Sequence, residues 1–172
     1  MCWRKIWSNS YQSYASVKAK QFQWKFLHNV PFTEHKLNLM GVSNGLCNIC
    51  KKERETLIHL FWDCPKTKQI WKNIDELFEK ITKDLNLKIE KLSFLNIAFG
   101  YRDTQADVIN TILFETKWQI WKYRNDCKFS SKLPNQPLVW QKIAFNNTKE
   151  QLSFQNIKYK DISLLQSIFK YL

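Results

Sequence analysis

The sequence predicts a mostly α-helical domain with an inserted loop that carries three cysteines and one histidine. Only three glycines and four prolines occur in 172 residues, which leaves little room for a turn-rich β fold. Apolar residues recur at helical spacing in several long segments, and at 44% of the chain they suffice for a core. A chain of this length forms one domain, or one domain with an appendage. We therefore expect residues 1–85 to hold the loop, and residues 86–172 to form a helical C-terminal extension packed on them.

A first helix is predicted over residues 10–29, with Ser10 or Ser13 as its cap. Its apolar stripe is wide and has a helical period. The members on one face are Tyr14, Val17, Gln21, Trp24 and His28, and those beside them are Ala15, Ala19, Phe22 and Phe26. Pro31 ends this helix because proline breaks the ladder of backbone hydrogen bonds.

A short helix is predicted next, over residues 34–40, with Thr33 as its cap and Gly41 as its end. A strongly amphipathic helix is predicted over residues 66–85. Its apolar face comprises Ile70, Trp71, Ile74, Leu77, Phe78, Ile81 and Leu85. Such a face is more often buried in a core than used as a binding groove.

The second half of the chain is also predicted to be helical. Residues 86–101 leave two options open, because residues 87–89 alternate like a strand, whereas residues 94–99 fit a short helix that Gly100 ends. Helices are then predicted over residues 105–127, 137–154 and 162–172, the last one capped by Asp161, with a loop over residues 130–137. The inward positions of the 105–127 helix are Val108, Ile109, Ile112, Leu113, Thr116 and Ile120.

The inserted loop has the pattern C-x2-C-x8-H-x4-C, formed by Cys47, Cys50, His59 and Cys64. Three thiolates and one imidazole suit one Zn²⁺ ion in a tetrahedral site. A redox pair is the alternative for the first two cysteines, but a redox pair is expected at a helix start after a strand, and this pair lies in a polar turn. Four protein ligands leave no open position for substrate, so the spacing predicts a structural zinc site rather than a catalytic one.

Neighbouring residues fit a zinc ion bound by three thiolates. The complex carries a net charge of about −1, and Lys51, Lys52 and Arg54 follow the first cysteine pair. Pro65 suits the first position of a helix, whose N-terminus favours a nearby thiolate. His28 and His35 flank the turn at Pro31 and are weaker candidates for metal ligands, because the loop already offers four.

Two cysteines, Cys2 and Cys127, remain outside the loop pattern. Free thiols together with a zinc site indicate a reducing compartment, so we expect the protein inside the cell, in the nucleus and cytoplasm. No apolar run reaches eighteen residues, and the N-terminus lacks a signal-like apolar core, so we expect no membrane association.

The charge balance points to a polyanion. Lys and Arg exceed Asp and Glu by 27 to 15, a net charge of +12, and residues 1–52 alone contain eight basic residues and one acidic residue. The candidate nucleic-acid ligands are Lys18, Lys20, Lys25, Lys51, Lys52 and Arg54. They share one surface if the first helix packs its Trp24 side on the core. The alternative for the helix is a solvated basic face over core aromatics.

Two tryptophans three positions apart, Trp118 and Trp121, are accompanied by Lys117, Lys122, Arg124 and Lys128. Aromatic rings beside cations can stack on nucleic-acid bases. They can also be core aromatics whose neighbouring lysines extend to solvent, and this interpretation is favoured because it is the commoner arrangement.

Several of these motifs together resemble the reverse transcriptase zinc-binding domain of LINE-type non-LTR retrotransposon polyproteins. The family pattern has a C-x2-C pair, then Glu-Thr, His-Leu-Phe, a last Cys and a downstream Trp, as in residues 47–71 of this chain. Residues 22–33 resemble the Trp-rich helix and Pro-Thr turn, Leu37 and Gly41 match a leucine and a glycine, and residues 118–125 resemble a downstream Trp-x-x-Arg-Asn segment.

The resemblance implies a non-catalytic accessory domain near the C-terminus of a reverse transcriptase polyprotein. Its expected partners are RNA or DNA, as template or target during target-primed reverse transcription, and the upstream reverse transcriptase domains. We expect no enzyme activity, because the sequence has no phosphate-binding loop, nucleophile elbow or paired polymerase carboxylates. A protein-interaction module, in which the zinc loop only joins helices, is the alternative.

Overall fold

The computed structural model describes residues 3–86, 88–102, 106–130 and 137–154, and the single positions 162, 166, 167 and 170. The prediction of a mostly helical fold is confirmed. In this part of the chain the elements are α1 (Trp3–Gln12), α2 (Val17–Leu27), α3 (Glu34–Leu39), the π-helical turn η1 (His59–Asp63), α4 (Pro65–Leu85), α5 (Phe94–Phe99), α6 (Ala106–Phe129) and α7 (Pro137–Phe154). The described residues form no strand, only an isolated antiparallel bridge between Leu46 and Arg54.

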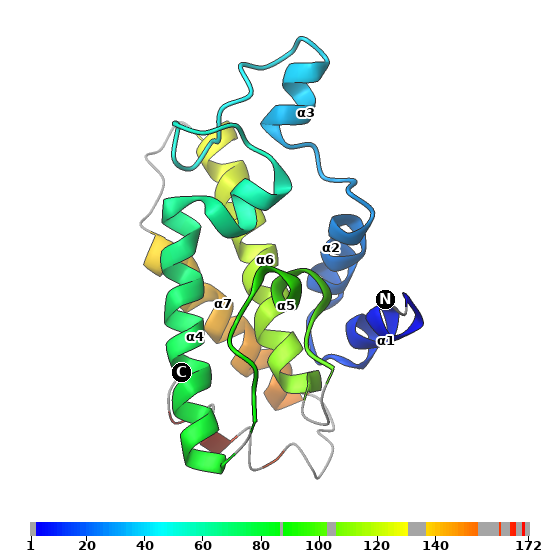
Figure 1. Cartoon of the computed structure of the whole chain (residues 1–172), viewed down its shortest axis with the longest axis vertical. Helices are drawn as coiled ribbons and strands as arrows, with labels where there is room; N and C mark the ends of the chain where they lie inside the picture. The colour runs from blue at the N-terminus through cyan, green and yellow to red at the C-terminus, as the bar shows by residue number, and fades with distance from the viewer. Residues whose placement is uncertain are drawn as a thin grey trace.

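Helix α6 is the centre of the fold. In Figure 1 it runs through the middle of the molecule, with α4 on one side and α1 and α2 on the other, and it packs on α7, α2 and α1. Its residues are buried on almost all sides, as expected of a helix enclosed by others. The buried apolar ones are Val108, Ile109, Ile112, Leu113, Phe114, Ile120 and Tyr123.

The amphipathic helix predicted over residues 66–85 is α4, which begins one residue earlier with Pro65 at its first position. Six of the seven predicted apolar residues are buried, and Leu85 is partly buried. Asn86 ends the helix in the left-handed conformation, with φ of 49°, which asparagine tolerates better than most residues. Periodicity was sufficient here because one face of the helix is polar and the other apolar.

The single helix predicted over residues 10–29 is wrong at residues 13–16, where the chain leaves the helical conformation. The chain instead forms α1 and α2, and Ser16, not Ser10 or Ser13, caps α2 by accepting a hydrogen bond from the N–H of Ala19. The break between the helices is stabilised by α6. Thr111 Oγ1 accepts from the Tyr14 N–H at 2.8 Å, and Glu115 Oε1 accepts from the Ser16 N–H at 2.6 Å. Residues almost one hundred positions away therefore replace the helical hydrogen bonds of this segment.

The exposed face of α2 also differs from the prediction. Ala19, Phe22 and Phe26 are buried, whereas Val17 and Trp24 are 70% and 49% exposed. The stripe with Ala19, Phe22 and Phe26 and the stripe with Val17 and Trp24 both have a helical period. The first of these is buried, because α2 packs on α6. The condition for the six basic residues to share a surface, Trp24 packed on the core, is not met.

Residues 86–101, for which the sequence left two options, contain a short helix, α5. Ser93 caps it, and the Ser93 and Asn96 side chains bond reciprocally to each other's backbone. Gly100 follows with φ of 77°, and a Cβ atom there would lie 2.7 Å from Asn110 Oδ1. The same Asn110 accepts from the Tyr101 N–H at 2.7 Å and donates to the Tyr101 carbonyl at 3.0 Å. Only glycine allows the chain to turn this closely over α6.

Some predictions lie outside the described residues, or on too few of them to be tested. These are the spare thiol of Cys2, the loop at 131–136, the Asp161 cap and the helix over 162–172. A division of the chain at residue 85 stays a prediction. None of the helices in the described ranges is long and apolar enough to span a membrane.

Lys117 is fully buried, so the expectation that its amine extends to solvent is wrong. The amine donates hydrogen bonds to Gln23 Oε1 on α2 and, at 2.6 Å, to the Ile97 carbonyl on α5. It also lies 4.9 Å and 4.7 Å from the ring centroids of Phe26 and Phe114. Burial lowers the pKa of Lys117 well below its ordinary value. A single amine thus joins α2, α5 and α6.

Stability should rise as pH increases toward the ordinary lysine pKa of 10.5. In this range the unfolded chain holds a proton on Lys117 that the folded protein has released, so raising the pH favours the folded state. Lys117→Met should reduce this pH dependence in denaturant unfolding measured at several pH values. The substitution also leaves the Gln23 and Ile97 oxygens without a donor, which lowers stability equally at every pH. The readout is therefore the slope of the free energy of unfolding against pH. Equal slopes for the two proteins would contradict the assignment.

Candidate metal centre

The first half of the ligand loop (residues 46–64) is a tight turn around the cysteine pair. The Leu46–Arg54 bridge closes it, and the Cys47 N–H donates to the Glu53 carbonyl at 2.7 Å. The Lys51 N–H donates back to the Cys47 carbonyl at 2.8 Å, and Lys51 adopts a left-handed φ of 59°. The turn places both cysteine side chains on one side of the backbone.

The second half of the ligand loop is the π-helical turn η1, which the sequence did not predict. The Cys64 N–H donates to the His59 carbonyl, five residues earlier, at 2.7 Å. A π turn is wider than an α turn, and such turns occur frequently at functional sites. Here it brings the two ligands of the second half, His59 and Cys64, onto the same side of the chain.

The π turn leaves two carbonyl groups without a backbone donor, and side chains of α4 donate hydrogen bonds to them. In an α-helix the Leu60 carbonyl would bind the Cys64 N–H, but that N–H is engaged by His59, and the Thr67 hydroxyl donates to Leu60 instead at 2.9 Å. The Phe61 carbonyl would bind residue 65, which is proline and has no N–H. The indole N–H of Trp71 takes this place at 2.6 Å. The downstream tryptophan thus has a role in the geometry of the loop.

The structure brings the four predicted ligand side chains together. The candidate donor atoms of Cys47, Cys50, His59 and Cys64 all lie within 4.8 Å of one another, and Cys50 Sγ is 3.4 Å from His59 Nε2. Zinc–sulfur and zinc–nitrogen bonds at tetrahedral angles separate neighbouring donors by about 3.5 to 3.8 Å. The donor set, its spacing and its burial therefore fit one Zn²⁺ ion. Neither His28 nor His35 belongs to this cluster.

The two buried thiols of the cluster are hydrogen-bonded to each other. A hydrogen bond from Cys47, together with the backbone N–H groups of Lys66 and Thr67 at the start of α4, lowers the pKa of Cys64 to about 5. The same hydrogen bond and burial raise the pKa of Cys47. Cys64 is therefore the thiolate of the pair, as expected beside a helix N-terminus. Zinc binding would release every proton that the three cysteines still hold, since cysteine ligates metals as thiolate.

Comparison with known proteins agrees with this geometry. A protein-family model described as zinc-binding in reverse transcriptase matches residues 1–71. Residues 1–71 are thus similar to that family. The matched residues contain all four members of the cluster and extend to Trp71, and the family is an accessory, zinc-binding one rather than a catalytic one. Neither the curated proteins nor the solved structures contain a match to the chain.

A buried charge cluster supports the ligand loop from α6. The Arg124 guanidinium donates to Glu55 Oε1 from Nε at 2.9 Å and from Nη2 at 2.7 Å, and Nη2 also contacts Glu34 Oε1 at 2.7 Å. Lys128 adds a contact to Glu34 at 2.6 Å. The side chains of Glu34, Glu55 and Arg124 are at most 7% exposed. We call these three residues the carboxylate–arginine cluster.

The carboxylate–arginine cluster also holds the backbone of the loop. Glu55 Oε2 accepts from the N–H of Asn48, between the first two ligands, at 2.8 Å, and Glu55 Oε1 accepts from the Glu34 N–H at 2.9 Å. Burial alone would raise the pKa of Glu34, but hydrogen bonds from Lys128, Ser43 and Asn48 and the charge of Arg124 lower it. Glu34 thus binds as an anion. Glu55 and Arg124 lie within the quoted motifs and Glu34 begins the predicted short helix, but nothing in the spacing indicated that they meet.

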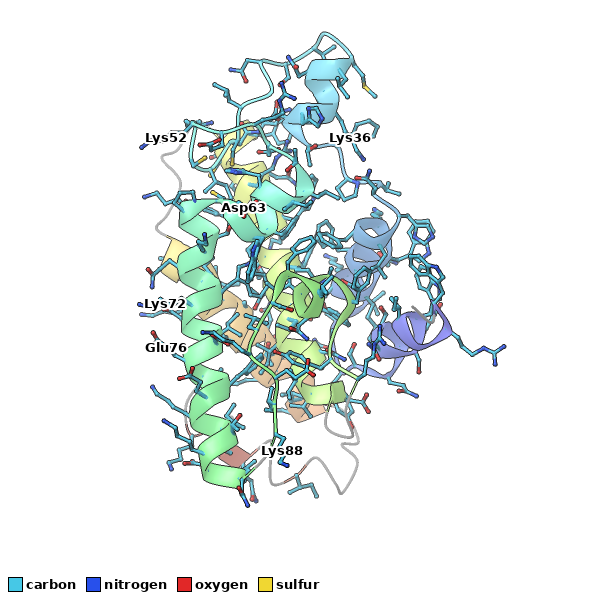
Figure 2. All side chains as sticks on the ribbon, in the orientation of Figure 1. Lys36, Lys52, Asp63, Lys72, Glu76 and Lys88 are labelled. Atoms are coloured by element: carbon cyan, nitrogen blue, oxygen red, sulfur yellow. The ribbon has the colours of Figure 1, made fainter. Side chains whose placement is uncertain are left out.

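The six candidate nucleic-acid ligands fall into two patches. Lys18, Lys20 and Lys25 form the α2 patch, and Lys51, Lys52 and Arg54 form the loop patch. All are exposed except Lys20, which is partly buried and donates to the Tyr11 carbonyl at 3.3 Å. Figure 2 shows Lys52 on the outer edge of the ligand loop, on the opposite side of the view from α2. The two patches therefore face different directions.

The two neighbouring tryptophans of α6 pack on the core, as the sequence favoured. Their ring centroids lie 5.7 Å (Trp118) and 5.5 Å (Trp121) from that of Phe22, and Arg124 lies over the Trp121 ring at 4.9 Å. Both rings are only partly buried, so part of each remains at the surface.

Cys50→Ser should abolish stoichiometric zinc binding, whereas Cys127→Ser should not, because Cys127 lies outside the cluster. Elemental analysis of protein purified without chelator should find one zinc per chain in wild type and in Cys127→Ser. Metal removal should open the loop and leave most helical circular dichroism, since the core around α6 extends far beyond the site. Zinc-free wild-type protein would refute the assignment.

Arg124→Met should destabilise the protein by about 3–5 kcal/mol, because it leaves the buried Glu55 carboxylate without its guanidinium and Glu34 with Lys128 alone. It should also speed zinc release to a chromogenic chelator, since Glu55 holds the backbone between Cys47 and Cys50. Arg124→Lys should be intermediate, because lysine keeps the charge and lacks the planar fork.

Lys72→Met is the matched control for the arginine variant. Lys72 makes a 3.9 Å exposed pair with Glu76 one turn along α4, and loss of such a pair changes stability by less than about 1 kcal/mol. If Arg124→Met unfolds at the same denaturant concentration as Lys72→Met, the cluster does not support the loop.

Proposed function

We propose that this chain is a zinc-stabilised accessory domain of a non-LTR retrotransposon reverse transcriptase, and that it binds template RNA or target DNA during target-primed reverse transcription. Cys47, Cys50, His59 and Cys64 hold one structural zinc. The observation that carries the proposal is the family match over residues 1–71, on a segment whose surface is strongly basic.

Zinc has a structural role in this proposal. Four protein ligands complete a tetrahedral site, so no position is open for a substrate or a catalytic water. The ion joins the cysteine turn to η1 and the start of α4, and the carboxylate–arginine cluster joins the same loop to α6. The loop patch is thereby held on a rigid support.

The distribution of charge supports a nucleic-acid partner. Residues 1–33 contain five Lys or Arg residues and no Asp or Glu. The two buried acidic residues of the matched segment, Glu34 and Glu55, face Arg124 rather than solvent. Their negative charge is neutralised inside the protein, whereas the α2 and loop patches are displayed at the surface. Such a surface attracts phosphates through counterion release.

A second candidate is a protein-interaction module that contacts the upstream reverse transcriptase domains. The end of α3 favours it, because Leu39, Met40 and Val42 are 74%, 61% and 70% exposed. Three adjacent exposed apolar side chains are typical of a protein contact. Both functions can exist in one domain, since α3 and the two basic patches are separate surfaces. We expect the protein to act inside the cell, in the nucleus and cytoplasm.

Charge reversal separates the two candidates. Lys18→Glu/Lys25→Glu should weaken binding of RNA and DNA of any sequence, and should reduce the slope of log affinity against log salt by roughly 0.7 to 0.9 per lost phosphate contact. Lys51→Glu/Lys52→Glu tests the loop patch in the same way. The measurement is a titration of labelled RNA and DNA at several salt concentrations.

The matched control is Lys72→Glu/Lys88→Glu, which lowers the net charge by the same four units at exposed positions far from α2 (Figure 2). It should weaken binding less than either patch variant. Wild-type protein that binds neither RNA nor DNA at low salt would contradict the proposal and leave the protein-interaction module.

A further inference from the structure

The exposed side of α2 lies between two surface grooves. The first, of about 560 Å³, runs between α1 and α2 and includes Trp7, Tyr11, Val17 and Trp24. The second, of about 510 Å³, runs between α2, the following turn and α6, and includes Phe22, Phe32, Trp118 and Trp121. Gln21 and Lys25 line both grooves, so α2 forms a ridge between them.

A row of aromatic rings includes Trp7 and Trp24 of the first groove and continues to Trp3 and His28, which contact them. Trp3 stacks on Trp7 with centroids 6.4 Å apart, Trp7 contacts His28 at 5.0 Å, and His28 contacts Trp24 at 4.2 Å. Trp3 and Trp24 remain 53% and 49% exposed. Neighbouring rings are inclined by only 28° to 32°, so they present similarly oriented faces. Exposing this much aromatic surface is unfavourable unless a partner covers it.

The charges around the grooves select among partners. Lys20 and Lys25 line the first groove, and Lys18 and Lys25 line the second. No acidic residue precedes Glu34 in the sequence, so α1 and α2 carry only positive charges. An apolar protein surface would gain nothing from these amines, whereas a strand with stacked bases and regular phosphates complements both the rings and the amines.

We infer that the α2 ridge and its two grooves bind single-stranded nucleic acid, with bases stacked on Trp24 and its neighbouring rings and phosphates on Lys18 and Lys25. This inference rests on the proposed function and names its substrate class. A duplex hides the faces of its bases, so only an unpaired strand can use the rings. Stacking accepts every base, so binding tolerates changes of sequence. The loop patch lines neither of these two grooves and takes phosphates alone.

Trp24→Ala tests the inference. Because Trp24 is exposed, its removal leaves the core intact, which thermal unfolding checks. A labelled RNA of about 12 nucleotides and a duplex of equal charge are titrated in the same buffer. Trp24→Ala should weaken single-strand binding by roughly ten-fold, leave duplex binding unchanged and keep the salt slope. Trp24→Phe should restore most of the loss, since a phenyl ring still stacks.

Phe129→Ala is the matched control, because Phe129 is 74% exposed at the end of α6 and lines neither groove. It should leave both affinities unchanged. Equal effects of Trp24→Ala and Phe129→Ala, or a Trp24→Ala loss that is the same for duplex, would overturn the inference while the proposed function stands. Failure of wild type to bind any nucleic acid at low salt overturns the proposed function itself. If Trp24→Ala spares nucleic acid but abolishes association with the upstream reverse transcriptase domain, the ridge is a protein interface and the inference is wrong.

Discussion

The position of the ligand loop depends on one buried guanidinium. Arg124 stands on α6, the most enclosed helix, and binds Glu55 in the loop and Glu34 at the start of α3. A buried charge is tolerated only when it is paired, so none of the three residues can be buried without the others. Since Glu55 also holds the backbone between two metal ligands, the orientation of the zinc site relative to the core follows from this contact.

The other side of the zinc site depends on backbone hydrogen bonds. Cys64 follows His59 by five positions, and the π turn brings both side chains into one ligand cluster. Its two carbonyls without helical partners are satisfied by Thr67 and Trp71 of α4. A loop attached through a metal, a salt-bridge cluster and two side-chain donors has few ways to move, which suits a rigid support for a basic surface.

Two of the four acidic residues in the matched segment, Glu34 and Glu55, are buried around Arg124, whereas Glu53 and Asp63 are exposed and the lysines of α2 and the loop also remain at the surface. Aromatic residues are divided in a similar way. Phe22 and Phe26 fill the core, whereas Trp24 and Trp3 remain at the surface beside those lysines. This arrangement underlies both the proposed function and the inference that the α2 ridge binds unpaired strands.

Local information in the sequence determined much of this protein. The spacing of Cys47, Cys50, His59 and Cys64 identified the ligands, and the apolar period of residues 65–85 identified α4, because ligand spacing and helical period act over a few residues. Only the tertiary structure decided where the first helix breaks, which stripe of α2 is buried, and that Lys117 and Arg124 lie inside. Each of those outcomes depends on contacts between residues 69 to 99 positions apart, such as Ser16 with Glu115 and Glu55 with Arg124. Such contacts leave no periodic signal in the chain, so the core that forms them had to be known first.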